Sequence, residues 1–209
     1  TGVLPLIADA ARLSAGPDPV FMRRFGDGAA NILFVGRVVP NKRVEDLVRA
    51  YYCFRNTVAP RSRLIVAGSM TGMDRYTASL RALVTLLDLP DVVFLNHVTD
   101  AQLYALYRTA SVFLSMSEHE GFCIPLIEAM HFRVPVVAYA AAAIPETLAG
   151  AGVLLREKDF AAVAELLGAL VSNTALRAAV VERQLPRAAA FSRETAAGRL
   201  RELLRPWLP

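Results

Sequence analysis

Short apolar runs alternate with helical patterns at least five times along the chain, and this alternation limits the fold more than any other feature. The runs are rich in Val, Ile, Leu and Phe, as is typical of strands buried on both faces of a parallel sheet. The hairpin signal Asn-Gly does not occur between them. The pattern predicts an α/β fold, with a right-handed, doubly wound, Rossmann-like parallel sheet of about six strands and helices on both faces.

The predicted elements follow from this reading. Strands are predicted at residues 32–35, 63–68, 92–95, 112–114, 135–138 and 152–155. Helices are predicted over about 19–25, 44–54, 75–87, 174–190 and 193–205, and others begin near residues 100, 125 and 159. Thr174 is the expected cap of one of the last helices, and Pro206 is expected to end the final one.

Length and composition fit one folded domain. The 209 residues suffice for one sizeable core, and 55% hydrophobic with 20% charged residues is the composition of a globular protein. Prolines and glycines punctuate residues 1–30, which predicts a connector with a short helix, followed by the main domain at residues 31–209.

Cysteine usage and the start of the chain indicate a cytoplasmic protein. Cys53 and Cys123 are the only cysteines, and no cationic, apolar leader opens the chain. These features are typical of reduced thiols in the cytoplasm, which is the localisation that we expect. The longest uncharged apolar stretch, residues 134–145, is too short to cross a bilayer.

The net charge of +4 comes entirely from residues 174–209, where seven arginines face three glutamates. Such a tail could contact the anionic inner face of a membrane, or it could be the solvated face of a helix. No aromatic residues interleave with the arginines, so nucleic acid is not expected as a partner.

The stretch 115–130 carries the clearest functional signal. A buried strand leads into a polar loop with one glycine, and Pro125 suits the first turn of a helix. A strand, a loop and a helix N-terminus in this order can bind an anion, because the first helical N–H groups have no partner. Glu120 and Glu128 flank this position, and carboxylates accept hydrogen bonds from sugar hydroxyls. The alternative is a plain turn with two solvated glutamates.

Two basic residues follow the first strand. Arg37 and Lys42 lie at its carboxyl end, which is where open parallel sheets bind their ligands. Arginine can bind a phosphate with two hydrogen bonds, and lysine adds a point charge. By themselves the two residues would more often be plain surface charge.

A metal site is not expected. His97, His119 and His131 are far apart, and none has a second ligand at helical spacing. Cys123 and His119 do not form a convincing nucleophile pair either, because no third residue is placed to orient them.

The residues Glu-His-Glu-Gly-Phe-Cys-Ile-Pro-Leu-Ile-Glu-Ala-Met at 118–130 resemble the Glu-x7-Glu signature of retaining family-four (group 1) glycosyltransferases of the GT-B fold. Gly36-Arg37 with Lys42 resembles the first donor-site motif of the same family. The resemblance covers nearly all of residues 31–205. It implies that the chain is the C-terminal, nucleotide-sugar-binding half of such an enzyme, and that an acceptor-binding domain precedes it.

The resemblance also implies a role for each site residue. Arg37 and Lys42 would neutralise the diphosphate of a UDP- or GDP-sugar, Glu120 would bind hydroxyls of the donor sugar, and Glu128 would bind the ribose. The remaining substrate-binding residues would be Gly36, His97, Val98, Gly121, Phe122, Cys123 and Ile124. The implied reaction transfers a hexose with retention to a glycan or lipid-linked acceptor, without a cofactor, a divalent metal or a protein nucleophile.

Four positions depart from the family pattern. Arg43, Asn96, Ala142 and Ala143 stand where the family usually has glycine. Alanine tolerates positive φ poorly, and its methyl group would narrow the approach to a ligand. These departures leave open a stand-alone nucleotide-binding or interaction module without catalysis.

A third reading is another GT-B enzyme such as a phosphorylase. It would need a cofactor lysine, and Lys42 and Lys158 are the only lysines. If the family reading is correct, this chain alone is expected to bind donor and to be inactive in transfer.

Overall fold

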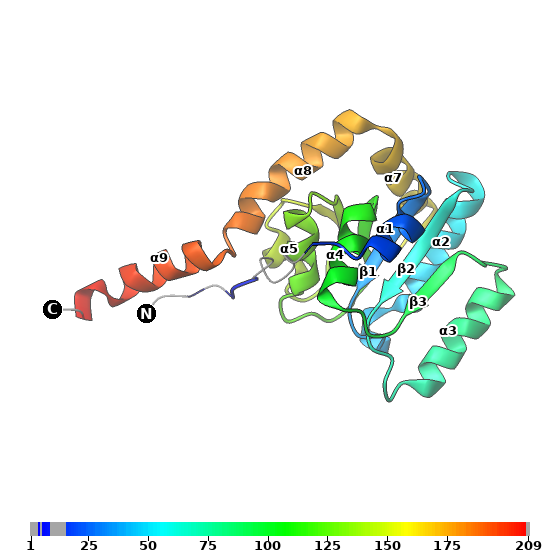
Figure 1. The fold of residues 1–209 in the computed structure, drawn as a ribbon, viewed down its shortest axis with the longest axis horizontal. Helices are drawn as coiled ribbons and strands as arrows, with labels where there is room; N and C mark the ends of the chain where they lie inside the picture. Colours follow the sequence, from blue (N-terminus) through cyan, green and yellow to red (C-terminus); the bar gives the residue numbers. More distant parts are fainter. Residues whose placement is uncertain (1–3, 5, 9–15, 208–209) are drawn as a thin grey trace.

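A six-stranded, all-parallel sheet forms the centre of the molecule in the computed structural model, which describes residues 4, 6–8 and 16–207 (Figure 1). The strands are β1 (Ala30–Val35), β2 (Ser62–Ala67), β3 (Val92–Leu95), β4 (Val112–Ser115), β5 (Val136–Tyr139) and β6 (Val153–Leu155). Every neighbouring pair is parallel. The predicted fold class is confirmed, and each predicted strand is found with its ends shifted by at most two residues.

The strand order is β3-β2-β1-β4-β5-β6, so the chain reverses its direction of progress between β1 and β4. These two strands are paired in the register Ile32 with Val112 and Leu33 with Phe113. In doubly wound sheets the loops after two such strands diverge and leave a crevice at the carboxyl edge. This position is therefore where a ligand site is expected.

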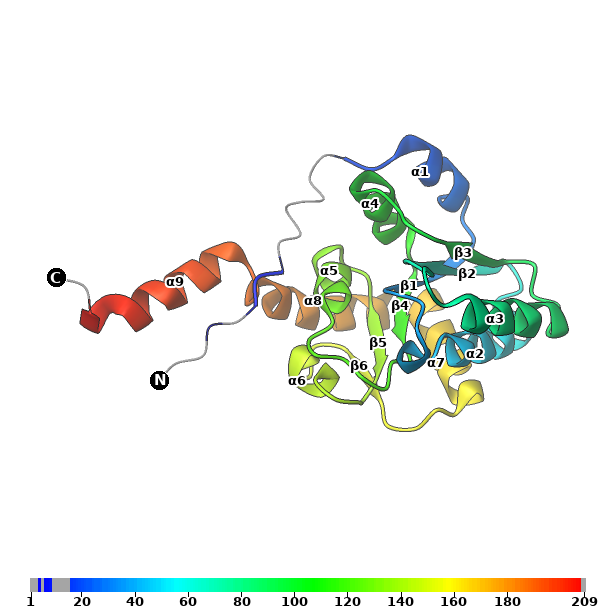
Figure 2. The ribbon, with the colours of Figure 1, turned by 90° about the horizontal axis from the view of Figure 1, so that it is seen from below.

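Helices cover both faces of the sheet, as Figure 2 shows. One face carries α2 (Val44–Thr57), α3 (Asp74–Leu86) and α7 (Phe160–Ser172). The other carries α1 (Pro19–Phe25), α4 (Asp100–Thr109), α5 (Ile124–His131) and the short α6 (Ile144–Leu148). The helices α8 (Thr174–Ala189) and α9 (Arg193–Leu204) follow, and the 3-10 turns η2 (Pro40–Lys42) and η3 (Arg205–Trp207) complete the described elements.

Strand residues alternate between two separate cores. Ile32 and Phe34 of β1 pack with α2 and α7, whereas Leu33 packs with α4 and α5. All three side chains are buried, and each such apolar side chain contributes about 1.5–3 kcal/mol. Burial on both faces explains why the strands are apolar without interruption.

Capping residues set the ends of several helices. Thr99 and Gln102 form a capping box at the start of α4, and the Asp159 side chain accepts hydrogen bonds at the start of α7. Asn173, and not the predicted Thr174, caps α8, because its side chain accepts from the N–H of Leu176. The final α-helix ends at Leu204, and the chain continues into the 3-10 turn that contains Pro206.

Gln184 of α8 is fully buried against β5. Its Nε2 donates to the carbonyl of Val134 at 2.8 Å, and its Oε1 accepts from the N–H of Val136 at 2.9 Å. The helix is thereby fixed to the start of β5.

Beyond α8 the chain turns, and α9 extends away from the body of the domain, next to the segment that contains residues 6–8 (Figures 1 and 2). Trp207 near its end is 84% exposed. In the described part of the chain no single helix is long and apolar enough to span a bilayer; α7 and α8 meet that test only jointly, with a bend of 94° between them.

Candidate functional site

The loops after β1 and β4 are joined to each other at the carboxyl edge of the sheet. The N–H of Glu118 donates to the carbonyl of Asn41 at 2.9 Å, and the Asn41 side chain donates to the carbonyl of His119 at 3.1 Å. The Ser117 hydroxyl lies 3.2 Å from both of these carbonyls. The basic loop and the acidic loop therefore form one rigid unit.

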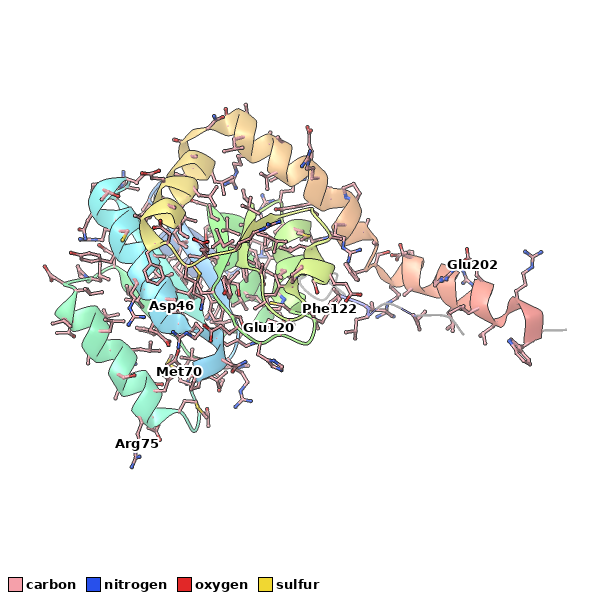
Figure 3. All side chains as sticks on the ribbon, turned by 180° about the vertical axis from the view of Figure 1, so that it is seen from behind. Asp46, Met70, Arg75, Glu120, Phe122 and Glu202 are labelled. Atoms are coloured by element: carbon pink, nitrogen blue, oxygen red, sulfur yellow. The ribbon has the colours of Figure 1, made fainter. Side chains whose placement is uncertain are left out.

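Lys42 and Glu120 meet at this junction. The Nζ of Lys42 lies 2.6 Å from Oε2 of Glu120, and their side chains are 17% and 9% exposed. Figure 3 shows Glu120 on the body of the domain, well away from Glu202 on α9. The structure thus brings together one of the predicted cations and one of the predicted carboxylates. The adjoining hydrogen bond between Asn41 and His119 joins residues that are 78 positions apart in the sequence.

The start of α5 presents unpaired backbone donors beside this ion pair. Cys123 is its N-cap residue, with φ 68° and ψ 67°, and no side chain caps the helix. Across the described residues, the N–H groups of Phe122, Cys123 and Ile124 have no acceptor within the protein. N–H groups with this placement can bind anions, and the binding of a ligand by these residues stays a prediction.

Cys123 is held in the neutral thiol form. Its partial burial raises the pKa of the thiol, and the nearby Glu120 carboxylate raises it further, while Lys42 opposes the shift. Because the thiolate is the nucleophile, this residue is a poor nucleophile at neutral pH.

Glu128 lies deeper than Glu120. Its side chain is 2% exposed, and Oε2 accepts a hydrogen bond of 2.8 Å from the hydroxyl of Tyr107 on α4. Tyr107 is a functional candidate that the sequence did not reveal, because a tyrosine at this position also fits the apolar face of a helix. The role of Glu128 toward a ribose stays a prediction.

Arg37 is exposed, and within the residues that the structure describes its side chain has no ion pair. It follows Gly36, whose N–H donates to the carbonyl of Ala67 at 2.9 Å. A Cβ atom at Gly68 would lie 1.9 Å from the carbonyl oxygen of Gly36. Only glycine at position 68 therefore permits this path of the basic loop, a constraint that sequence analysis missed.

The residues after β3 lie at the same carboxyl edge but two strands away from β1. His97 is exposed, and Val98 is half-buried against the α4–α5 core. Asn96 accepts a hydrogen bond of 3.2 Å from the N–H of Met70. The contacts among the described residues do not connect His97 to Lys42 or Glu120, and its role stays a prediction.

Two of the positions that lack the family's glycine adopt the left-handed conformation. Arg43 has φ 51° and Ala142 has φ 48°, whereas Ala143 has φ −79°. A non-glycine residue in this conformation costs about 1–2 kcal/mol. At Arg43 the side chain is engaged in three ion pairs, with Glu45, Asp46 and Glu118. Ala142 has no such compensation.

A second charged cluster supports the basic loop from below. Asp46, 2% exposed, accepts from Arg43 at 3.1 Å, from Arg49 at 2.9 Å and from Lys158 at 2.8 Å. Lys158 also binds Glu118 at 2.7 Å. Burial raises the pKa of Asp46, but the hydrogen bonds from Lys158 and Arg43 outweigh it and leave that pKa below its usual range.

This cluster engages Lys158, which is one of the two lysines available to bind the cofactor of a phosphorylase. The lysine is engaged by two carboxylates, and its Nζ lies 4.7 Å above the ring of Tyr139. Sequence analysis did not find the cluster, because Lys158 and Asp46 are 112 positions apart. Among the described residues, no three His, Cys, Asp or Glu side chains are grouped so as to hold a metal ion.

Known protein sequences resemble most of this chain. A family profile described as "Glycosyl transferases group 1" matches residues 23–184. The chain is 29% identical over 162 residues to O-antigen chain mannosyltransferase B of Escherichia coli, which covers 78% of this chain and 42% of that relative. The chain therefore spans less than half the length of this curated relative.

Solved structures show the same fold. Anabaena HepE, crystallised with UDP and glucose, superposes with a TM-score of 0.79 at 20% identity, over 96% of this chain and 55% of that one. The C-terminal domain of the group 1 protein LpcC from Francisella tularensis superposes with a TM-score of 0.70 at 21% identity, over 89% of this chain and 97% of that one. Because the family profile matches most of its length, the chain belongs to the group 1 glycosyl transferases.

Proposed function

We propose that this chain is the donor-binding half of a retaining glycosyltransferase, and that it binds a UDP- or GDP-sugar at the carboxyl ends of β1 and β4. The observation that carries the proposal is the Lys42–Glu120 contact of 2.6 Å, directly beside the N-terminus of α5. One side of this junction suits a diphosphate and the other suits sugar hydroxyls.

In the proposed reaction, positive charge stabilises the departing diphosphate. Lys42, the exposed Arg37 and the N–H groups at the start of α5 would supply this charge as the glycosidic bond breaks, so the reaction would need no divalent metal. Glu120 would orient the sugar by accepting hydrogen bonds from its hydroxyls. Transfer would proceed with retention by attack from the same face, without a covalent protein intermediate.

The names of similar proteins support the substrate class. The relative in Escherichia coli is a mannosyltransferase of the O-antigen chain, and the structure of HepE contains UDP and glucose. A hexose donor and a glycan or lipid-linked acceptor are consistent with both. In this proposal the acceptor is held by a further domain, so the 209-residue chain binds donor but does not transfer sugar.

Calorimetric titration of the chain with UDP-glucose, UDP-N-acetylglucosamine and GDP-mannose tests the proposal. We expect one of them to bind at millimolar concentration or below. Arg37→Ala and Lys42→Ala should each weaken binding by roughly tenfold or more, because a hydrogen bond to a charged group contributes ~1.5–3 kcal/mol. A folded sample that binds none of the three would contradict the donor site.

Arg108→Ala is the matched control. Arg108 is an exposed arginine near the end of α4, which leads into the opposite edge of the sheet. Its removal changes the net charge by the same amount and should leave the affinity unchanged. Equal losses in all three variants would mean that binding depends on overall charge and not on this site.

A further inference from the structure

Arg187, near the end of α8, binds the carboxyl end of the short helix α6. Its Nε donates to the carbonyl of Thr147 at 2.9 Å and its Nη2 to the carbonyl of Glu146 at 2.7 Å. The guanidinium also lies 4.5 Å above the ring of Phe191. A cation in this position satisfies carbonyls that have no partner inside the helix. Arg187 therefore fixes α6 to α8.

Helix α6 and its N-cap residue Ala143 hold the loop that contains Glu120. The N–H of Ala143 donates to the carbonyl of Glu120 at 3.2 Å, and the hydroxyl of the buried Thr147 donates to the carbonyl of Phe122 at 2.7 Å. Through these two bonds, α6 positions the backbone on both sides of Gly121.

A contact between two aromatic rings links the same loop directly to the residues that follow α8. The rings of Phe122 and Phe191 pack edge to face, with centroids 5.0 Å apart. Phe191 is 5% exposed, and its carbonyl accepts a hydrogen bond of 3.0 Å from the N–H of Ala8. Figure 2 shows the segment around residues 6–8 passing the corner between α8 and α9. Three parts of the chain thus meet at Phe191.

We propose that Arg187 and Phe191 are positioning residues for the donor site. The inference rests on the proposed function, because it concerns the placement of Glu120 and of the N–H groups at the start of α5. Arg187 acts through α6, and Phe191 acts through the ring of Phe122. The pair also ties this loop to residues 6–8 and to α9, so a shift of either segment would reach the donor loop through Phe191.

Arg187 differs in its contacts from the arginine one turn earlier on α8. The neighbouring Arg183 and Arg187 both line the groove between α8 and residues 149–151, which follow α6, yet within the described residues the Arg183 side chain has no hydrogen bond or ion pair. In the part of the chain that the structure describes, Arg187 alone donates hydrogen bonds from α8 to the carbonyls of α6. Arg183 therefore offers a matched control of the same residue type on the same helix.

The test combines donor affinity with amide exchange measured by NMR on the 209-residue chain. The reporter is the N–H of Ala143, which donates to Glu120. In Arg187→Gln and in Phe191→Leu we expect its exchange to become at least about tenfold faster, because the bond that protects it opens more often. Donor affinity should fall by roughly threefold to tenfold, as for other residues that act through a contact network. Arg187→Lys should recover part of both effects.

Two controls separate positioning from loss of stability. Arg183→Gln should leave exchange and affinity unchanged. Val163→Ala, on buried α7 at the opposite face of the sheet, should lower the melting temperature without a selective change at Ala143. If the two positioning variants accelerate Ala143 no more than Val163→Ala does at equal loss of melting temperature, the inference is wrong.

Failure of the proposed function would look different. If the unmodified chain binds no UDP- or GDP-sugar, the donor site fails, whereas exchange at Ala143 still decides whether Arg187 and Phe191 position the loop. Phe191→Leu keeps an apolar side chain and Arg187→Lys keeps the positive charge, and the melting temperature of each variant shows that it is folded before exchange is compared.

Discussion

The two sides of the candidate site are supported in different ways. The basic loop after β1 is fixed by its immediate neighbours: Gly68 at the end of the adjacent strand, and the Asp46 cluster at the start of the helix that follows. The acidic loop after β4 is held by Thr147 of α6, which Arg187 of α8 binds in turn, and the helix α5 that follows the loop is held by Tyr107 of α4. The basic side is thus supported by the strand and the helix next to it together with Lys158 from a distant segment, whereas the acidic side depends on the packing of three other helices.

The largest effect is expected where the basic side has no room to adjust. Gly68→Ala would place a Cβ atom 1.9 Å from the Gly36 carbonyl oxygen, so the backbone of the basic loop must move. We expect a loss of about 2–4 kcal/mol in the free energy of unfolding, together with loss of donor binding. Urea denaturation and calorimetry measure the two effects.

Gly198→Ala serves as the control for Gly68→Ala. A Cβ atom at this helical position of α9 meets open space, so the change should be neutral or stabilising by up to about 1 kcal/mol. If Gly68→Ala were tolerated equally well, the backbone of the basic loop could move without loss of stability, and Gly68 would not fix its path.

Asp46→Asn tests the electrostatic support of the same side. The folded pKa of Asp46 lies below its unfolded value near 4, so its contribution to stability is present above about pH 4 and is lost as the pH falls through the folded pKa. We expect the variant to lose about 1.5–3 kcal/mol at pH 7, because the hydrogen bonds that the buried carboxylate accepts from Arg43, Arg49 and Lys158 are lost or weakened. Its melting temperature should also depend less on pH below about pH 4.

Glu165→Gln changes an exposed residue of α7 and should leave the dependence of the melting temperature on pH below about pH 4 unchanged. If Asp46→Asn and the unmodified protein lost stability in parallel on acidification, the pH dependence would come from other carboxyl groups.

Cys123 reports on the acidic side with a smaller effect. The Glu120 carboxylate is one cause of its raised thiol pKa, so Glu120→Gln should lower that pKa and raise the fraction of thiolate. In a Cys53→Ser background, we expect alkylation by iodoacetamide at pH 8 to become severalfold faster. Glu118→Gln, two positions earlier in the loop, should have a weaker effect. A rate that does not respond to Glu120 would place the carboxylate farther from the thiol.

The smallest effect is expected at the two left-handed turns. Ala142→Gly relieves backbone strain but gives the unfolded chain more freedom, so we expect a change within about 1 kcal/mol, in the stabilising direction. Arg43→Gly relieves the same strain but removes ion pairs with Glu45, Asp46 and Glu118, and should destabilise. Paired urea denaturation curves compare the two; stabilisation by both would mean that the ion pairs of Arg43 contribute little.

The contrast between the two sides also explains what could be predicted from the sequence. The strands were predictable because burial on both faces leaves them uninterruptedly apolar. Arg37 and Lys42 were recognised because they follow the end of one strand. Glu120 was recognised because the Glu-x7-Glu motif lies in one continuous stretch of sequence. All of these signals lie within short stretches of chain.

The supporting contacts were not predictable, since they join residues far apart in the sequence. Lys158 and Asp46 are 112 positions apart, and Gln184 is 48 positions from Val136. Glycine at position 68 could be read as the end of a strand, but the carbonyl that it accommodates belongs to another strand. Periodicity within one element carries no information about which distant side chain fills a space beside it.

The amide of Gln184 has a further consequence for how the sheet ends. One side-chain amide offers a donor and an acceptor, as a peptide group does, and here it takes the place of a hydrogen-bonding neighbour beside the first residues of β5. The helix thereby contributes the equivalent of one residue of strand. Strand β6 pairs with β5 only from Val137 onward, so the glutamine satisfies peptide groups that β6 does not reach.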